Sequence, residues 1–167
     1  MGSALRLAHR RDAHTIAALS RDLIEAGLGW SWTWRRVMRS IEDADTNVLL
    51  ALDGSPSVRG FAIMKYGEDE AHLLLLAVPL ALRRRGIGSA LVGWLEAAAL
   101  VAGVRQIVLE ARESNAPARA FYRRLGYREI GVLPGYYQGR EDSVRLIKNL
   151  WQPAGTNVAP HSGDNPA

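Results

Sequence analysis

A run of arginines and glycines in the middle of the chain has the residue types that bind phosphate. Residues 83 to 89 read RRRGIGS, between an apolar stretch of strand length at 72 to 78 and a helical pattern. The N-terminus of a helix offers unpaired N–H donors and a partial positive charge, glycine allows close approach, and arginine contacts phosphate oxygens. The arrangement predicts a site for a pyrophosphate-bearing ligand. A tight turn with solvated arginines explains the same residues equally well.

The spacing of the glycines differs from that of the common nucleotide-binding loops. A dinucleotide fingerprint needs a third glycine at position 91, where this chain has Leu91. The P-loop pattern G-x-x-x-x-G-K-[ST] is absent from the sequence. The remaining pattern is Arg83-x-x-Gly86-x-Gly88, so both common loop types are excluded.

Length and composition narrow the class of protein. The chain has 167 residues, of which 48% are hydrophobic and 23% charged, as expected for one globular domain. It has no cysteine, which excludes disulfides and a cysteine nucleophile, and its four histidines lack metal-ligand spacing, so no metal is expected. Since no apolar run reaches the ~18 residues of a membrane span and no signal-peptide pattern is present, we expect a cytoplasmic protein without a membrane partner.

The positive charge of the chain has two explanations. The formal net charge is +4, and many arginines gather at 83–85 and at 119–128. Clusters of this kind suit a polyanionic small ligand as well as a nucleic acid. The sequence has no helix-turn-helix, zinc-finger or RNA-binding signature, so no nucleic-acid partner is expected. Binding that falls steeply with salt would indicate one.

Hydrophobic periodicity predicts a single α/β domain with a mixed central sheet flanked by helices. The expected order is β-α-α-β-β-β-α-β-α-β-β. Asp12 and Asn115 are expected to cap helices, and Gly126 to end one. Residues 53–56 and 134–139 have loop composition. The domain is expected to span residues 1–151, and residues 152–167, rich in Pro, Gly, Ser and Asn, to form a disordered tail.

Two motifs together resemble the GNAT superfamily of acetyl-CoA-dependent N-acetyltransferases. The segment Arg83-x-x-Gly86-x-Gly88 is similar to its pyrophosphate motif. About thirty residues later, Asn115-x-x-Ala118-x-x-Phe121-Tyr122-x-x-Leu125-Gly126-Tyr127 is similar to its second motif. Within the superfamily, LEARESN at 109–115 and YYQGRED at 136–142 resemble the ribosomal-protein-alanine N-acetyltransferases (the RimI type). The region from Trp30 to Trp34 departs from that type.

The resemblance implies two catalytic roles. It makes Glu110 a general base, directly or through water, and Tyr122 a general acid for the leaving thiolate. By itself, Glu110 would be interpreted as a paired or solvated strand residue and Tyr122 as a packing residue beside the buried stripe of Ala118, Phe121 and Leu125. Burial beside Val108 would raise the pKa of Glu110. His72, alone among apolar residues, is interpreted as structural.

The resemblance also implies where acetyl-CoA binds. The pantetheine arm and the thioester carbonyl would be bound by main-chain groups of the central strand. These groups belong to Leu76, Ala77 and Val78. The turn would bind the pyrophosphate through Arg83, Arg84, Arg85, Gly86, Ile87, Gly88 and Ser89. Asn115 would contact the cofactor arm.

The acceptor is the least determined part of the prediction. Trp32, Tyr136 and Tyr137 are candidates for an acceptor wall, and packing explains each of them as well. The RimI likeness implies transfer to a protein N-terminal α-amine. A small-molecule amine (an antibiotic, a polyamine or an amino acid) is the alternative, and a non-catalytic acetyl-CoA sensor is disfavoured by Glu110 and Tyr122. A homodimer is compatible with the sequence and not required by it.

Overall fold

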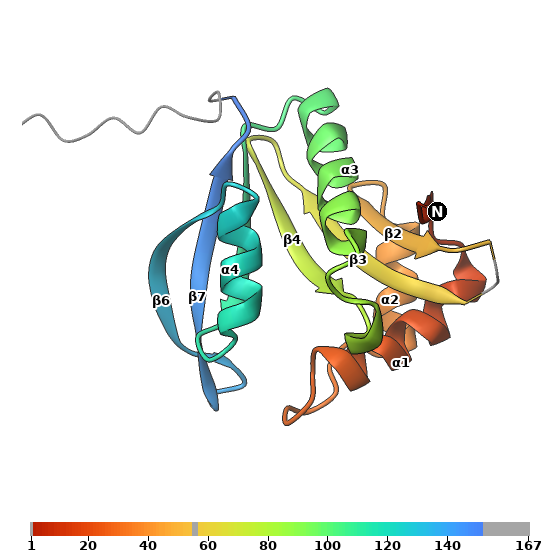
Figure 1. Cartoon of the computed structure of the whole chain (residues 1–167), viewed down its shortest axis with the longest axis horizontal. Helices are drawn as coiled ribbons and strands as arrows, with labels where there is room; N and C mark the ends of the chain where they lie inside the picture. The colour runs from red at the N-terminus through yellow and green to blue at the C-terminus, as the bar shows by residue number, and fades with distance from the viewer. Residues whose placement is uncertain (1, 55–56, 152–167) are drawn as a thin grey trace, which may run out of the picture.

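A seven-stranded mixed sheet with helices on both faces forms the protein (Figure 1). The computed structural model describes residues 2–54 and 57–151. Its strands are β1 (Ala4–Leu7), β2 (Thr46–Leu52), β3 (Val58–Tyr66), β4 (Glu70–Ala77), β5 (Gln106–Arg112), β6 (Arg128–Tyr137) and β7 (Glu141–Asn149). Its helices are α1 (Ala13–Leu23), α2 (Trp34–Glu42), α3 (Ile87–Val101) and α4 (Ala116–Arg124), with 3-10 turns η1 (Arg10–Asp12) and η2 (Leu80–Leu82).

The order of strands and helices along the chain confirms the predicted order. In the sheet the strands lie in the order β1-β2-β3-β4-β5-β7-β6, and only β4 and β5 are parallel neighbours. Positions 55 and 56 of the predicted turn, and the whole of the predicted tail at 152–167, lie outside the described residues.

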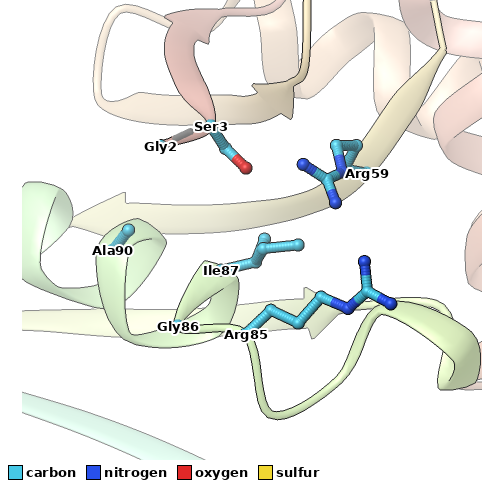
Figure 2. A pocket seen from close by; sticks show the side chains of 7 residues that line it. All are labelled: Gly2, Ser3, Arg59, Arg85, Gly86, Ile87 and Ala90. Atoms are coloured by element: carbon cyan, nitrogen blue, oxygen red, sulfur yellow. The ribbon is translucent and has the colours of Figure 1, made fainter.

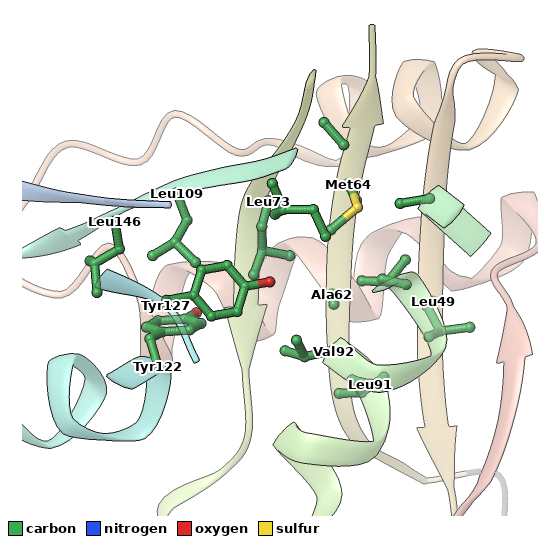
Figure 3. Close-up of a cluster of buried hydrophobic side chains, with 14 of the residues drawn as sticks. Leu49, Ala62, Met64, Leu73, Leu91, Val92, Leu109, Tyr122, Tyr127 and Leu146 are labelled. Atoms are coloured by element: carbon green, nitrogen blue, oxygen red, sulfur yellow. The ribbon is translucent and has the colours of Figure 1, made fainter. Parts of the chain in front are cut away.

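Successive side chains of each strand point to opposite faces of the sheet, and they form two hydrophobic cores, one on each face. Leu49 and Ala51 of β2 belong to the core that contains α3 and α4, whereas Val48 and Leu50 belong to the core that contains α1 and α2. Figure 3 shows the first core, where Tyr122 lies among apolar side chains of the sheet. The central strands of the sheet are therefore covered on both faces.

The pairing between β4 and β5 is short. It joins Glu70–Leu73 to Gln106–Leu109 and ends there. Against β3, Met64 pairs with Leu73 and Ile63 with Leu75, so Leu74 is an additional residue of β4. Such a bulge bends a strand and increases its twist. Beyond it β4 runs away from the β5–β7 part of the sheet (Figure 1), and the β5-facing edge of its last residues has no partner strand in the described chain.

Two local predictions need correction. The loop expected at 134–139 is wrong in its first half, because β6 continues to Tyr137 and the turn covers only the next residues. Pro134, which has no N–H, lies where the pairing of this edge strand with β7 is irregular, between Leu133 and Tyr137. In α4 the buried residue is Tyr122, whereas the predicted stripe of Ala118, Phe121 and Leu125 is only half-buried.

Candidate active site

The carboxylate of Glu110 on β5 is enclosed by side chains from three other strands. Its Oε1 accepts a hydrogen bond from Nε of Arg145 on β7 at 3.0 Å and forms an ion pair with Nη2 of the same guanidinium at 2.8 Å. Its Oε2 lies 2.5 Å from Nε2 of His72 on β4 and 3.3 Å from the hydroxyl of Tyr136 on β6. Only 3% of the Glu110 side chain is exposed. A single carboxylate therefore connects four strands.

The partners of Glu110 decide its charge. Burial raises the pKa of Glu110, but the hydrogen bonds and electrostatic interactions with His72 and Arg145 outweigh burial, and the pKa lies below the ordinary value. Burial thus acts on this pKa in the expected direction, but the net shift is downward because of the two partners, which the sequence did not reveal. Glu110 is ionised at neutral pH and acts only as a hydrogen-bond acceptor.

Tyr122 lies on the other side of the sheet, in the core beneath α4. It is 8% exposed and makes edge-to-face contacts with Phe121 and Tyr127, at centroid distances of 5.1 and 5.7 Å. Burial raises the pKa of Tyr122 far above that of a free phenol, and Tyr137 adds to the shift. The phenol therefore keeps its proton at neutral pH.

Tyr137 links Glu110 to Tyr122. Its hydroxyl donates to the main-chain oxygen of Glu110 at 3.2 Å, and it is close enough to Tyr122 to contribute to the raised pKa there. Its ring packs edge-on against Tyr136 at 5.0 Å. The structure thus brings together Glu110, Tyr122, Tyr136 and Tyr137, which the sequence had placed in three separate segments.

The arginine–glycine turn forms the N-terminus of α3, as predicted. Gly86 is the N-cap residue with φ +79°, and Arg84 also has a positive φ of +62°. Glycine adopts this conformation without the cost that other residues incur. The first intrahelical bond runs from Ala90 N to Gly86 O at 2.9 Å. The N–H groups of Ile87, Gly88 and Ser89 precede it, so they are available to an anion.

The side chains of this turn face two directions. Arg85, Gly86 and Ile87 line a pocket of about 300 Å³ towards β1 and β3, into which Arg59 also points (Figure 2). Gly88 faces α4 instead, where an added Cβ would lie 3.1 Å from the ring of Phe121. The missing side chain therefore lets the ring of Phe121 of α4 lie close against the start of α3.

Two predicted cofactor contacts are occupied by the protein itself. Arg83 donates from Nε to the carbonyl of Val78 at 3.0 Å, which joins the turn to the end of β4. Asn115 caps α4, as predicted, by accepting from Ala118 N at 3.2 Å. Both side chains shape the neighbourhood of the turn.

Trp32 does not lie on an open surface. It is 7% exposed, in the core with α1 and α2, and the Arg36 guanidinium covers its ring at 3.9 Å. Trp34 stacks on His14 at 4.8 Å, and Trp30 is 45% exposed. The packing interpretation therefore describes Trp32 and Trp34, and Trp30 is the exposed member of the three.

A buried acid, Glu25, holds the segment between α1 and α2. Its Oε1 accepts from the main-chain N of Ser31 at 2.7 Å, from the Ser31 hydroxyl at 2.5 Å and from Trp32 N at 3.2 Å. Glu25 is 6% exposed. Sequence reasoning missed this residue because an acid just after a helix is usually solvated.

The same segment is fastened to the end of the sheet that carries Glu110. Arg112 of β5 donates to the carbonyls of Ile24 and Ala26, at 2.6 and 3.0 Å. Gln138 exchanges two hydrogen bonds with Gly29, N–H to Oε1 at 2.8 Å and Nε2 to carbonyl at 2.7 Å. The α1–α2 segment and the β6–β7 turn therefore meet beside the Glu110 cluster.

Substitution of Glu25 should loosen this segment selectively. A hydrogen bond to a charged group contributes about 1.5–3 kcal/mol, and Glu25→Ala removes several of them. We expect faster amide exchange at Ser31 and Trp32 with the sheet unaffected. The control is Glu42→Ala, which removes an exposed carboxylate that pairs with Arg10 at the surface. Unchanged exchange at both amides would contradict the role assigned to Glu25.

Comparison with known proteins gives the family. The model of the acetyltransferase (GNAT) family matches residues 13–127, which include the Glu110 strand, the turn before α3 and the whole of α4. The chain belongs to the GNAT acetyltransferase family. The resemblance stated from the two motifs is thereby confirmed.

Relatives with known names place the chain within the GNAT family. The [ribosomal protein bS18]-alanine N-acetyltransferase of Salmonella typhimurium is 38% identical over 98 residues, 57% of this chain and 66% of that protein. The chain thus spans less than two thirds of the length of this relative, and 59% of another. The ribosomal-protein-S18-alanine N-acetyltransferase of Escherichia coli has a similar structure, with a TM-score of 0.77, 25% identity and coverage of 94% and 99%.

A further GNAT structure shares the fold alone. Arabidopsis thaliana NAA60, solved in complex with acetyl-CoA, is 21% identical, with a TM-score of 0.77 and coverage of 88% of this chain and 98% of that chain. In the part of the chain that the structure describes, no helix is long and apolar enough to cross a membrane. The same residues contain no group of three or more His, Asp or Glu side chains arranged to hold a metal.

Proposed function

We propose that this GNAT protein transfers the acetyl group of acetyl-CoA directly to a primary amine. The observation that carries the proposal is the open edge of β4 beyond its four-pair contact with β5. Glu110 flanks the start of this opening on one face of the sheet, and Tyr122 lies in the core on the other face. A thioester bound along the open edge would lie between an ionised carboxylate cluster and a protonated phenol.

The residues around the opening suit acetyl-CoA. Main-chain groups of Leu76, Ala77 and Val78 on the edge away from β3, apart from the Val78 carbonyl that Arg83 contacts, can bind an amide-containing arm in the manner of a neighbouring strand. The N–H donors at the start of α3 suit the pyrophosphate. Arg84 and Arg85 add positive charge. The acetyl-CoA complex of NAA60, which has the same fold, supports this assignment.

The proposed chemistry needs one proton acceptor and one proton donor. An amine attacks a thioester only when neutral, whereas a free α-amine has a pKa of about 8 and a lysine about 10.4. The Glu110 cluster supplies the group that accepts the proton of the amine. Tyr122 supplies the donor side, by giving its phenolic proton to the departing thiolate of CoA.

We propose a protein N-terminal α-amine as the acceptor. The names of the Salmonella typhimurium and Escherichia coli relatives support this class. Tyr136 and the exposed Trp30 offer aromatic surface near the Glu110 cluster for the first residues of a chain. A cytoplasmic location agrees with such a substrate.

The test is a thiol-release assay with acetyl-CoA. We expect turnover with short peptides that begin with Ala, Ser or Met, and none when the same peptides carry an acetylated N-terminus. Turnover confined to polyamines, aminoglycosides or free amino acids would contradict the proposed peptide acceptor. It would still support acetyl transfer to an amine. Binding of CoA without turnover on any amine would overturn the proposed activity.

A further inference from the structure

The hydrogen bonds of Glu110 leave it no free position for a substrate. An ionised carboxylate has about four lone-pair directions. Four donor contacts fill them here, two from Arg145, one from His72 and one from Tyr136. With 3% of its side chain exposed, Glu110 meets neither a substrate amine nor bulk water.

His72, unlike Glu110, is accessible to solvent. Its side chain is 31% exposed although its Nε2 is bonded to Glu110. We propose that His72 takes up the proton of the acceptor amine through water, and that Glu110 is a positioning residue that orients the imidazole. This inference rests on the proposed function and changes which residue of the cluster exchanges the proton.

The hydrogen bond to Glu110 determines the tautomer of His72. Because an ionised carboxylate cannot donate, the shared hydrogen belongs to Nε2 of the imidazole. Nδ1 of a neutral ring then carries the lone pair, and no hydrogen bond to Nδ1 occurs among the described residues. A carboxylate that fixes a histidine in this way also stabilises the imidazolium that forms when the ring accepts a proton.

The other charged groups near His72 are largely engaged elsewhere. Lys65, its cross-strand partner on β3, is bonded through Nζ to Asp43 at 3.2 Å. Arg145 of β7 is bonded to Glu110, and Arg36 of α2, which lowers the pKa of Tyr136, lies against Trp32. Tyr136 of β6 donates to the same carboxylate oxygen as His72. Glu110 is therefore the anionic partner that contacts the imidazole.

The proton balance of the proposed step is complete. The acceptor enters as R–NH3+ and loses one proton through water to Nδ1 of His72, which later releases it to solvent. The neutral nitrogen attacks the thioester carbon, a C–N bond forms and the C–S bond breaks. The thiolate takes the proton of Tyr122, which recovers one from the acylated nitrogen. The products are the amide, CoA–SH and one proton in solution.

The decisive variants are His72→Gln and His72→Ala. Glutamine can still donate to Glu110 but cannot act as a base, so we expect kcat with a peptide acceptor to fall about 10²-fold or more. The KM for acetyl-CoA and the melting temperature should change little. Imidazole added to H72A should restore part of the activity. The matched control is His9→Gln, at an exposed histidine outside the cluster, which should behave as wild type.

The pH profile and the tautomer give independent readouts. A base must be neutral to accept a proton, so the wild-type kcat should have an acidic limb, falling as the pH is lowered. This limb should be absent from H72Q. Nitrogen-15 NMR of histidine in the resting protein should show the Nε2–H tautomer for His72 and a tautomer mixture in Glu110→Gln.

The outcomes separate the inference from the proposed function. Wild-type turnover that H72Q leaves unchanged, or H72A activity that imidazole does not raise, would overturn the role of His72 and keep acetyl transfer. An Nδ1–H tautomer in the wild type would also overturn it, without any assay of activity. Absence of wild-type turnover on every amine would overturn the proposed function itself.

Discussion

Replacing Tyr122 by phenylalanine is expected to lower kcat by about 10²- to 10⁴-fold, the usual contribution of a general acid. The raised pKa of Tyr122 keeps the phenol protonated, so the hydroxyl can donate to a developing thiolate at any physiological pH. The ring should remain in place between Phe121 and Tyr127, because the substitution removes no carbon atom. CoA affinity, measured by calorimetry, should therefore stay within about twofold.

Tyr66→Phe provides the control for this experiment. Tyr66 is half-buried and, like Tyr122, has a pKa raised by burial, but its hydroxyl accepts a hydrogen bond from Asn47 at 2.9 Å. We expect Y66F to keep wild-type kcat and to lose a little stability. Equal kcat in Y122F and wild type would show that the thiolate leaves without help from this residue.

A pair of glycine substitutions should have opposite effects on stability. An added Cβ at Gly60 would lie 3.1 Å from the carbonyl oxygen of Ala77 and 3.1 Å from Ile87 Cγ2. The carbonyl belongs to the sheet and cannot yield, so Gly60→Ala should cost about 1–3 kcal/mol. Gly93, on the exposed face of α3, has nothing within 4 Å of its Cβ position. Gly93→Ala should stabilise the protein by about 0.5–1 kcal/mol.

Thermal unfolding measures both effects. For a domain of this size 1 kcal/mol corresponds to roughly 2–4 °C, so the two melting temperatures should differ by several degrees. G60A should also weaken CoA binding, because Ala77 and Ile87 lie on either side of the proposed cofactor position. A shift of the same sign in both variants would contradict the close packing of β3 against α3.

The features predicted correctly from sequence are those that depend on neighbours along the chain. Asn115 caps α4 because the cap needs only a side-chain oxygen and an N–H three residues later. Gly86 takes a left-handed conformation that glycine favours at the start of α3. The GNAT motifs combine such local requirements, so Glu110 and Tyr122 could be selected before their surroundings were visible.

The features that sequence reasoning missed depend on distant parts of the chain. His72 and Glu110 are 38 positions apart, and Gly29 and Gln138 are 109 apart. No periodicity reports such pairs, so His72 looked structural and the pKa of Glu110 was expected to rise. Tyr122 was assigned to the margin of a buried stripe because helical spacing shows which residues share a face. Helical spacing does not show how closely the sheet packs against that face, and this packing decides which side chain of the helix is buried.

The short contact between β4 and β5 also has a consequence for how the protein folds. Most pairs of neighbouring strands are antiparallel, and β2-β3-β4 and β6-β7 are joined by short connections, so they can form early. The parallel pair must close a loop of 36 positions between Glu70 and Gln106 for only four residue pairs. We expect this junction to be the last part of the sheet to assemble. His72 lies on β4, before this junction in the chain, and Tyr122 lies on α4, after β5. A chain whose two parts had formed without the β4–β5 pairing would therefore have hydrophobic cores but no assembled catalytic site.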